Sequence, residues 1–263
     1  MRWVRRHLLA FAALAVLAYL LLPNLVVAVF SFNNPSGRYN YEWTKFSTQA
    51  WQHPCGTPGI CDSLGLSLQI GITASVVATI LGTMVAFALG RHRFRGRAAT
   101  NLLIFMPMAT PEVVMGSSLL TLFVMLGVPS GTKAILIAHI MFCLSFVVVA
   151  VKARVASLDP RLEEAAADLG ADPLQTFLRV TLPLTAPGIA AGALLAFSLS
   201  FDDYIITNFQ ASPSSITFPM YVWGASTRGT PVQINVIGTV MFVVALVVVF
   251  TGQLVSSRRQ KAA

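Results

Sequence analysis

Charged residues are scarce in this chain. They make up 11% of its 263 residues, whereas a soluble globular domain has about 25%. So few charges could not cover a surface that faces water. The apolar residues come in long blocks, and a bilayer core about 30 Å thick needs roughly 20 apolar residues per helix. The scarcity of charge therefore excludes a soluble domain and predicts an all-α integral membrane protein, which we treat as one domain over residues 1–263.

Cysteine is also scarce, and its pattern excludes two classes of protein. Three cysteines are too few for a disulfide scaffold, and the sequence has neither a C-x-x-C pair nor a His/Cys cluster with metal-ligand spacing. We expect no metal site and no cofactor. His139 and Cys143 share one apolar block, where a buried, hydrogen-bonded histidine and a small packing residue are expected. No nucleophile–base pair supports a membrane enzyme.

Six apolar blocks are each long enough to cross a bilayer. Lipid forces a spanning backbone to satisfy its own hydrogen bonds, so each block is predicted to be a helix. The first begins as a signal peptide does, but its apolar run exceeds the 7–15 residues of a cleaved segment, so we expect a retained span. The predicted spans are residues 8–32, 64–90, 101–126, 134–151, 187–212 and 235–255.

The basic residues stand at the ends of these blocks. The net charge of +8 alone could suggest nucleic acid, but no basic patch with interleaved aromatic residues is present. Alternate connections hold fourteen and four of the Lys and Arg residues, which by the positive-inside rule predicts six spans with both termini in the cytoplasm. The richer side comprises Arg2, Arg5, Arg6, Arg91, Arg93, Arg95, Arg97, Lys152, Arg154, Arg161, Arg179, Arg258, Arg259 and Lys261, and the poorer side Arg38, Lys45, Lys133 and Arg228.

The connection between the fourth and fifth blocks has helix signals that a plain linker would not need. Asp159-Pro160 is typical of an N-cap followed by proline at the first helical position. Gly170 can end that helix in the left-handed conformation, and Asp172-Pro173 repeats the cap signal. The second short helix is expected to stop near Leu182-Pro183. Residues 159–183, called the elbow below, are thus predicted to form two short helices joined by a tight turn on the cytoplasmic side.

The elbow has a recognisable motif. Glu164-Ala165-Ala166 is followed by Gly170 and, nine residues later, by Val180-Thr181-Leu182-Pro183. This pattern resembles the EAA signature of the permease subunits of ABC importers. In that family the elbow is a coupling helix that docks in a groove of the cytoplasmic ATPase. The resemblance implies that Glu164, Ala165, Ala166, Gly170, Leu182 and Pro183 serve this coupling.

Three further segments resemble the second permease of polyamine (spermidine/putrescine) importers. They are Pro111–Val114, Ser200–Asp203 and Thr230–Asn235. The resemblance implies six helices in the type I (MetI-like) fold in a bacterial inner membrane, a second permease, two copies of an ATPase and an extracytoplasmic binding protein. The chain itself has no G-x-x-x-x-G-K-[ST] loop, so ATP hydrolysis is expected from a separate chain.

Three acids lie inside the apolar blocks. An ionised acid at a helix centre costs about 2.5–3.5 kcal/mol on insertion scales, so Glu112, Asp202 and Asp203 are expected to face a cavity or a partner. Neighbouring residues on a helix point about 100° apart, so only one of the two aspartates is expected to face a pathway. With Tyr204 they are our candidate pathway residues, and a hydrogen-bonded structural acid is the alternative for each. Acidic spans without Lys or Arg favour a cationic substrate.

We therefore expect a non-enzymatic permease subunit of an ATP-driven importer that moves polyamine-like cations. One alternative keeps the class but changes the substrate, to an amino acid derivative or a metal complex. Another is a stand-alone proton-coupled transporter that uses the acids as proton carriers, against which the elbow argues because such a transporter needs no ATPase. Cys55 and Cys61 fall in the first outer loop, where a disulfide can form, and free thiols are the alternative there.

The charge asymmetry makes a testable prediction about topology. Reporter proteins fused to the C-terminus should be active only if they are of the kind that works in the cytoplasm. Activity of a reporter that works only outside the cytoplasmic membrane would contradict the six-span arrangement.

Overall fold

The computed structural model describes residues 2–262, with the side chains of residues 7–252. The basic side chains at positions 2, 5, 6, 258, 259 and 261 lie outside those described. Among the described residues, every regular element is a helix, and the one β interaction is an isolated bridge between Asn33 and Phe46. It divides into two compact units, one formed by the residues up to Cys61 and from Tyr221 on, the other by Asp62–Met220. The single domain over residues 1–263 stays a prediction.

Five helices are long and apolar enough to cross a membrane, or six spans if one bent helix pair is counted as a span. The prediction of an all-helical membrane fold is thus confirmed. The five segments are His7–Phe30, Ile60–Arg91, Thr132–Ala156, Pro173–Asp202 and Val232–Gly252.

The first unit contains α1 (Arg2–Phe30), α2 (Gln49–Gln52) and α12 (Val232–Ala262), and the chain enters it again within α11 (Phe218–Arg228). Helices α1 and α12 contact each other, and α2 packs on the first turns of α12. The loop that joins α1 to α2 is ordered by two asparagines. The Asn33 amide donates to the side chain of Asn40 (2.7 Å), and the Asn40 backbone N–H donates to the Thr230 hydroxyl (3.0 Å).

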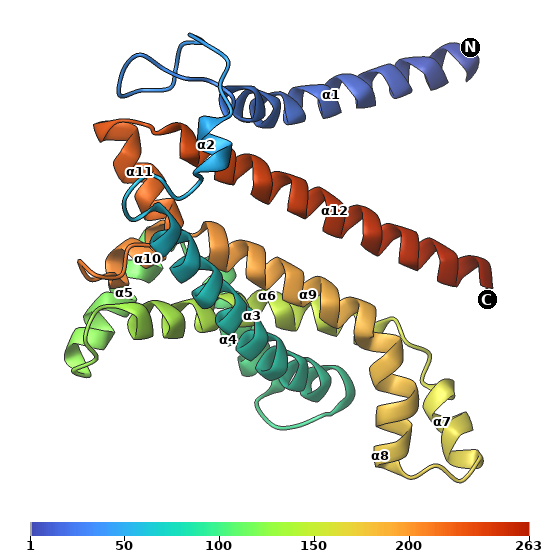
Figure 1. Ribbon diagram of the computed structural model, residues 1–263. Helices are drawn as coiled ribbons and strands as arrows, with labels where there is room; N and C mark the ends of the chain where they lie inside the picture. The colour runs from blue at the N-terminus through green and yellow to red at the C-terminus, as the bar shows by residue number, and fades with distance from the viewer. Residues whose placement is uncertain (1, 263) are drawn as a thin grey trace. The chain divides into compact units, whose positions relative to one another are not determined.

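The second unit is built around α6 (Thr132–Ala156), which packs most extensively on α9 (Leu182–Asp202). The two helices run side by side in Figure 1. Small residues let them approach closely, as where Gly192 faces the backbone of Val147 and where the Cys143 thiol donates to the Ala196 carbonyl (3.3 Å). Close approach through small residues is how helices associate in lipid, where apolar burial against a neighbour gains little.

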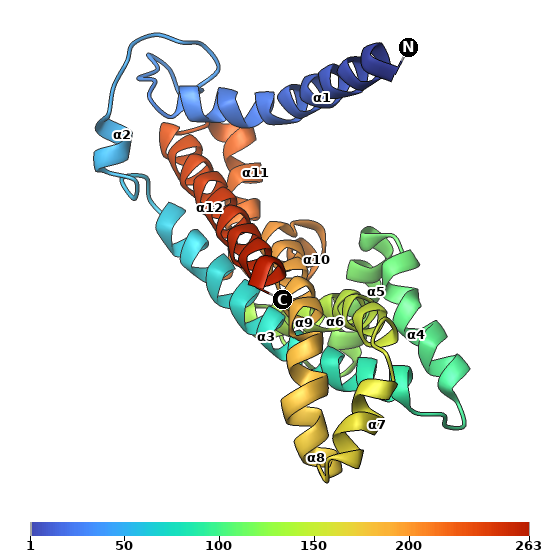
Figure 2. The same ribbon diagram turned by 90° about the vertical axis from the view of Figure 1, so that its right-hand side faces the viewer.

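Three further helices of this unit surround α6. They are α3 (Ile60–Arg91), α4 (Arg97–Ala109) and α5 (Glu112–Met125). Helices α4 and α5 both contact α6 and lie on one side of it in Figure 2. On α3, Gly82 lies directly against Val147 of α6.

The third predicted span, residues 101–126, is not one helix. Helices α4 and α5 meet at an angle of 111°. The cause is Pro111, because a proline disfavours the α conformation at the residue before it and cannot donate a backbone hydrogen bond. Thr110 accordingly has an extended conformation (φ −85°, ψ 132°). The expectation of a continuous helix here is wrong.

The fifth predicted span, residues 187–212, differs in two ways. The helix begins earlier, and it ends at Asp202 because Asp203 is extended (φ −65°, ψ 125°). A separate short helix, α10 (Ile205–Gln210), follows. The prediction of one helix to residue 212 is therefore wrong, and the reason is the capping of α10 by Asp203 that is described below.

The contact between Gly82 and Val147 makes a stability prediction. A Cβ at Gly82 would lie 2.7 Å from Val147 Cγ1, so Gly82→Ala should lower the free energy of unfolding by about 1–3 kcal/mol through overpacking. Gly65, on the same helix, is the matched control, because a Cβ there meets no atom within 4 Å. Gly65→Ala should be neutral or stabilising, by at most about 1 kcal/mol. Thermal unfolding in detergent measures both, and equal midpoints would contradict the close packing of α3 on α6.

Candidate functional site: the elbow and the acids at two helix breaks

The elbow consists of α7 (Arg161–Asp168), a glycine turn and a second helical segment. The Asp159 carboxylate accepts the Arg161 N–H (3.0 Å), and the Asp172 carboxylate accepts the Gln175 N–H (2.7 Å). Gly170 has a φ of +82° between them, in the left-handed region that a side chain rarely tolerates. The two caps and the glycine turn therefore follow the sequence prediction. Both helical segments lie beyond the N-terminal end of α9 (Figures 1 and 2).

The second helical segment does not stop at Leu182-Pro183, so that prediction is wrong. Helix α8 (Pro173–Thr176) continues through a π-helical turn, η1 (Phe177–Thr181), directly into α9. A π turn pairs groups five residues apart instead of four, and this wider turn accommodates a proline that has no N–H to donate. The elbow is thus continuous with a predicted membrane span.

The predicted coupling residues lie on an accessible surface of the elbow. Glu164, Ala165 and Gly170 are exposed, as is Pro183, whereas Ala166 and Leu182 are half-buried. Leu169, beside the glycine turn, is 90% exposed, the largest value among the large apolar side chains that the structure describes.

Two of the three acids sit exposed at the two helix breaks. Glu112 occupies the first turn of α5, directly after the break at Thr110-Pro111. Asp202 is the last residue of α9, and its side chain is exposed as well. Tyr204, half-buried, follows that second break. The two breaks thus each present one carboxylate at a helix end.

Asp203 lies in a different environment from its neighbour, because it is buried with 8% of its surface exposed. Its carboxylate caps α10, accepting the backbone N–H groups of Ile206 (3.3 Å) and Thr207 (2.7 Å). It also accepts the Thr207 hydroxyl (2.8 Å) and lies 3.3 Å from Nε2 of His139. These contacts all lie within the second unit, as expected of a structural acid, and which of the three acids faces a pathway stays a prediction.

His139 of α6 joins the elements on both sides of the second break. Its Nδ1 lies 2.7 Å from the Ser200 hydroxyl of α9, and its Nε2 lies 2.9 Å from the Thr207 hydroxyl of α10. The single hydroxyl hydrogen of Thr207 goes to Asp203, so every atom is satisfied when a neutral His139 donates from Nε2 and Ser200 donates to Nδ1. The expected buried, hydrogen-bonded histidine is confirmed.

Helix α10 also contacts α5, which follows the first break. The Gln210 amide donates to the Gly116 carbonyl (3.0 Å), one turn after Glu112. Gly116 leaves room for the Phe209 ring, which a Cβ would meet at 2.6 Å. The segments that follow the two breaks are therefore packed against each other.

Sequence reasoning did not find these partners. The pairs His139–Asp203 and Gly116–Gln210 join residues 64 and 94 positions apart, and no local pattern marks them. The composition of the spans contains one signal. His139 lies in a block without Lys or Arg, so it is a candidate partner for a buried acid.

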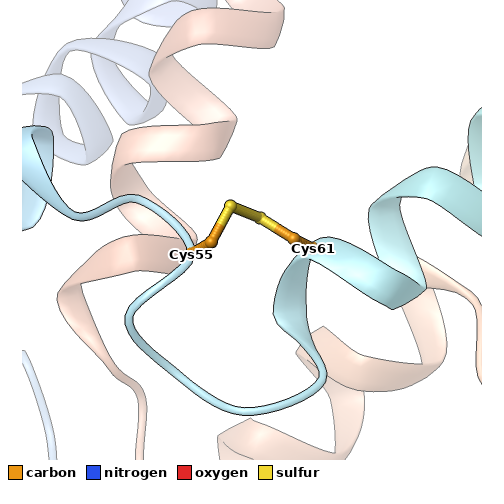
Figure 3. The surroundings of a disulfide bond; sticks show 2 residues. All are labelled: Cys55 and Cys61. Atoms are coloured by element: carbon orange, nitrogen blue, oxygen red, sulfur yellow. A yellow bond between two sulfur atoms is a disulfide. The ribbon is translucent and has the colours of Figure 1, made fainter.

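Cys55 and Cys61 are joined by a disulfide in the first unit, with their Cα atoms 5.4 Å apart. Figure 3 shows the bond connecting the loop after α2 to the start of α3. The intervening turn contains Gly59, with a φ of +78°. The bond closes a loop of a few residues at the end of a predicted span.

Residues 78–261 match the family model described as "Binding-protein-dependent transport system inner membrane component". The chain belongs to this family. The match includes the elbow and both helix breaks, and it places the chain among inner membrane components of transport systems.

Relatives over nearly the whole chain are permeases. The chain is 36% identical over 247 residues to the spermidine/putrescine transport system permease protein PotC of Escherichia coli (strain K12). The alignment covers 94% of this chain and 93% of the relative. It is 37% identical over 250 residues to the putrescine transport system permease protein PotI of the same organism, covering 92% and 88%.

Solved structures show the same fold. One chain of a bacterial ABC transporter involved in the import of the acidic polysaccharide alginate aligns with a TM-score of 0.68 at 19% identity, over 98% of both chains. A chain of the MetNI methionine ABC transporter in an inward-facing conformation aligns with a TM-score of 0.59 at 15% identity, over 74% of this chain and 94% of that one. The family member thus has the type I ABC importer permease fold that was predicted.

The disulfide makes a prediction about thiol chemistry. An impermeant maleimide should label intact cells only after a reductant is added, because bridged Cys55 and Cys61 offer no thiol. The background variant is Cys143→Ala, which removes the buried free cysteine and leaves only this pair. Labelling without reductant in that background would mean that the two residues are unpaired.

Proposed function

We propose that this chain is a permease subunit of an ATP-driven importer that moves polyamine-like cations into the cytoplasm. The observation that carries the substrate class is the pair of exposed carboxylates, Glu112 and Asp202, each at a helix break within predicted spans that hold no Lys or Arg. The names of the PotC and PotI relatives support the same class of substrate.

The end of α9 is suited to a cation for two reasons. The last carbonyls of a helix have no partner within it, and the helix dipole makes this end negative. Asp202 adds a full negative charge at the same place. Carbonyls and acids at the ends of discontinuous helices bind cations in transporters. A polyamine that gives up part of its hydration here can form charge-assisted hydrogen bonds in exchange.

The acids divide into two roles under this proposal. Asp203 is occupied by α10, Thr207 and His139, so it holds the break in shape. Asp202 and Glu112 are exposed and have no such partner among the described contacts, so they are the candidates for substrate contact. Tyr204 follows the same break and completes the candidate pathway on this subunit.

The partners follow from the elbow and from the family. We propose that the importer contains two copies of a cytoplasmic ATPase, one of which binds the exposed surface around Glu164 and Gly170, and that a second permease supplies the other half of the pathway. An extracytoplasmic binding protein would deliver the substrate to the opposite side. Closing of the ATPase pair would displace the elbow, and α9, which is continuous with it, would carry that movement to the break at Asp202.

Uptake measurements test the role of the acids. Glu112→Gln and Asp202→Asn keep size and hydrogen bonding but remove charge, so each should lower uptake of labelled spermidine or putrescine about tenfold, since a charge-assisted hydrogen bond contributes about 1.5–3 kcal/mol. Membrane abundance should not change, because both side chains are exposed. Asp203→Asn should instead lower abundance together with uptake, because Asp203 is buried in its network.

The control is Asp62→Asn, which neutralises an exposed acid in the first turn of α3, away from both breaks. Its uptake should equal that of the unaltered protein. Uptake at the unaltered rate in both the Glu112 and the Asp202 variants would refute the cation pathway, and failure of the assembled importer to take up any polyamine would refute the substrate class.

A further inference from the structure

Helix α7 of the elbow is not anchored by apolar burial. None of its side chains is buried in the part of the chain that the structure describes. A cavity of about 540 Å³ lies against it, lined by Phe87 of α3, by His92 just after that helix, by Ala167 of α7 and by Phe177 of η1. Packing therefore cannot by itself hold α7 in a defined position relative to the spans.

The side chain of Glu163 makes polar contacts that connect α7 to α3 and to the π turn before α9. Glu163 Oε1 lies 3.0 Å from Nη2 of Arg91, the last residue of α3. The same oxygen accepts the hydroxyl of Thr181 (2.9 Å), the last residue of the π turn before α9. A single side chain thus contacts two spans at the point where each of them meets the elbow.

The Arg91 guanidinium depends on this contact. Its Nε and Nη2 atoms are buried and, in the described structure, form no hydrogen bond of good geometry. The 3.0 Å contact of Nη2 with Glu163 Oε1 is an ion pair between side chains that are 22% and 34% exposed, and it compensates part of the charge. Removing one partner of a partly buried pair leaves an uncompensated charge, whereas removing both leaves none. A single truncation and a double truncation should therefore differ in their effect on stability. Both remove the contact, so both should have the same effect on the transmission of movement.

Glu163 and Glu164 are neighbours but point to different surroundings. Glu164 is exposed, as a residue that contacts the ATPase would be. Glu163 is half-buried against Arg91 and Thr181. The two adjacent acids therefore divide the elbow into an outer, partner-facing side and an inner side that contacts the spans.

We propose that Glu163, together with Arg91 and Thr181, is the connection through which the elbow moves the spans, so that Glu163 is a positioning residue for the coupling of ATP hydrolysis to transport. This inference rests on the proposed importer function. When an ATPase displaces α7, the ion pair pulls on the end of α3 at the same time as the continuous helix pulls on α9. Without it, α7 can move over the cavity and leave α3 behind.

The experiment uses the complete importer, with its ATPase, second permease and binding protein, reconstituted in vesicles. It measures three quantities for each variant: co-purification of the ATPase, ATP hydrolysis stimulated by the binding protein, and substrate transported per ATP hydrolysed. The variants are Glu163→Ala, the double truncation Arg91→Ala with Glu163→Ala, and the charge swap Arg91→Glu with Glu163→Arg beside its two single changes. Asp168→Ala, an exposed acid on the same helix, is the matched control, and Glu164→Ala tests the outer side.

We expect Glu163→Ala to keep the ATPase bound while transport per ATP falls about tenfold, a typical size for a coupling between two sites. The double truncation should restore any lost abundance, because no charge is left unpaired, yet transport per ATP should stay low. The charge swap should recover at least about half of the coupling that each single reversal loses. Glu164→Ala should instead weaken ATPase co-purification, and Asp168→Ala should change nothing.

Three outcomes would overturn the inference. Transport per ATP could be unchanged in both the Glu163 variant and the double truncation, it could recover fully in the double truncation, or Glu163→Ala could release the ATPase as strongly as Glu164→Ala does. The first two would mean that the contact serves stability alone, and the third that Glu163 is itself an ATPase contact. If the unaltered complex hydrolyses ATP but transports no polyamine, the proposed substrate fails and the connection can still be measured with whatever solute the binding protein carries.

Discussion

A helix that breaks inside a membrane leaves backbone groups that lipid cannot bond, and in this protein the carboxylate of Asp203 satisfies the amide groups at one such break. It caps α10 and contacts His139, which in turn contacts Ser200 and Thr207. This network fixes where α9 ends and where α10 lies. Because α10 then packs on α5, the position of the first break also depends on it.

The two breaks and the elbow all lie in the second unit, and α9 connects the elbow to the second break. Each break presents a carboxylate at a helix end. At the end of α9 the unpaired carbonyls and the helix dipole add to the negative charge of Asp202, whereas Glu112 stands at the positive, N-terminal end of α5 and contributes its own charge alone. The elbow is joined to the spans by two routes, the unbroken backbone from α8 into α9, which ends at the second break, and the ion pair from Glu163 to Arg91 of α3. The helix that ends at the candidate cation site therefore begins at the surface available to a partner.

Local patterns predicted much of this arrangement. Apolar blocks of about 20 residues indicated the spans because the bilayer sets their length. The caps at Asp159 and Asp172 and the turn at Gly170 were predicted because each depends on residues within a few positions of one another. Pro111 carried a local signal for a break that the length of the apolar block concealed, whereas Pro183 carried the same signal and the π turn before it kept the helix continuous.

By itself the sequence determined the membrane class, the places of four of the six spans, the caps and turn of the elbow, and the family, since these depend on composition and short-range spacing. It also placed three acids inside apolar blocks, but it could not assign their roles. Only the tertiary structure decided that Asp203 is buried against His139 while Asp202 and Glu112 are exposed, and that Glu163 contacts Arg91 while Glu164 faces outward. Neighbouring residues on a helix point in directions about 100° apart, so the packing of distant segments decides what each of them contacts.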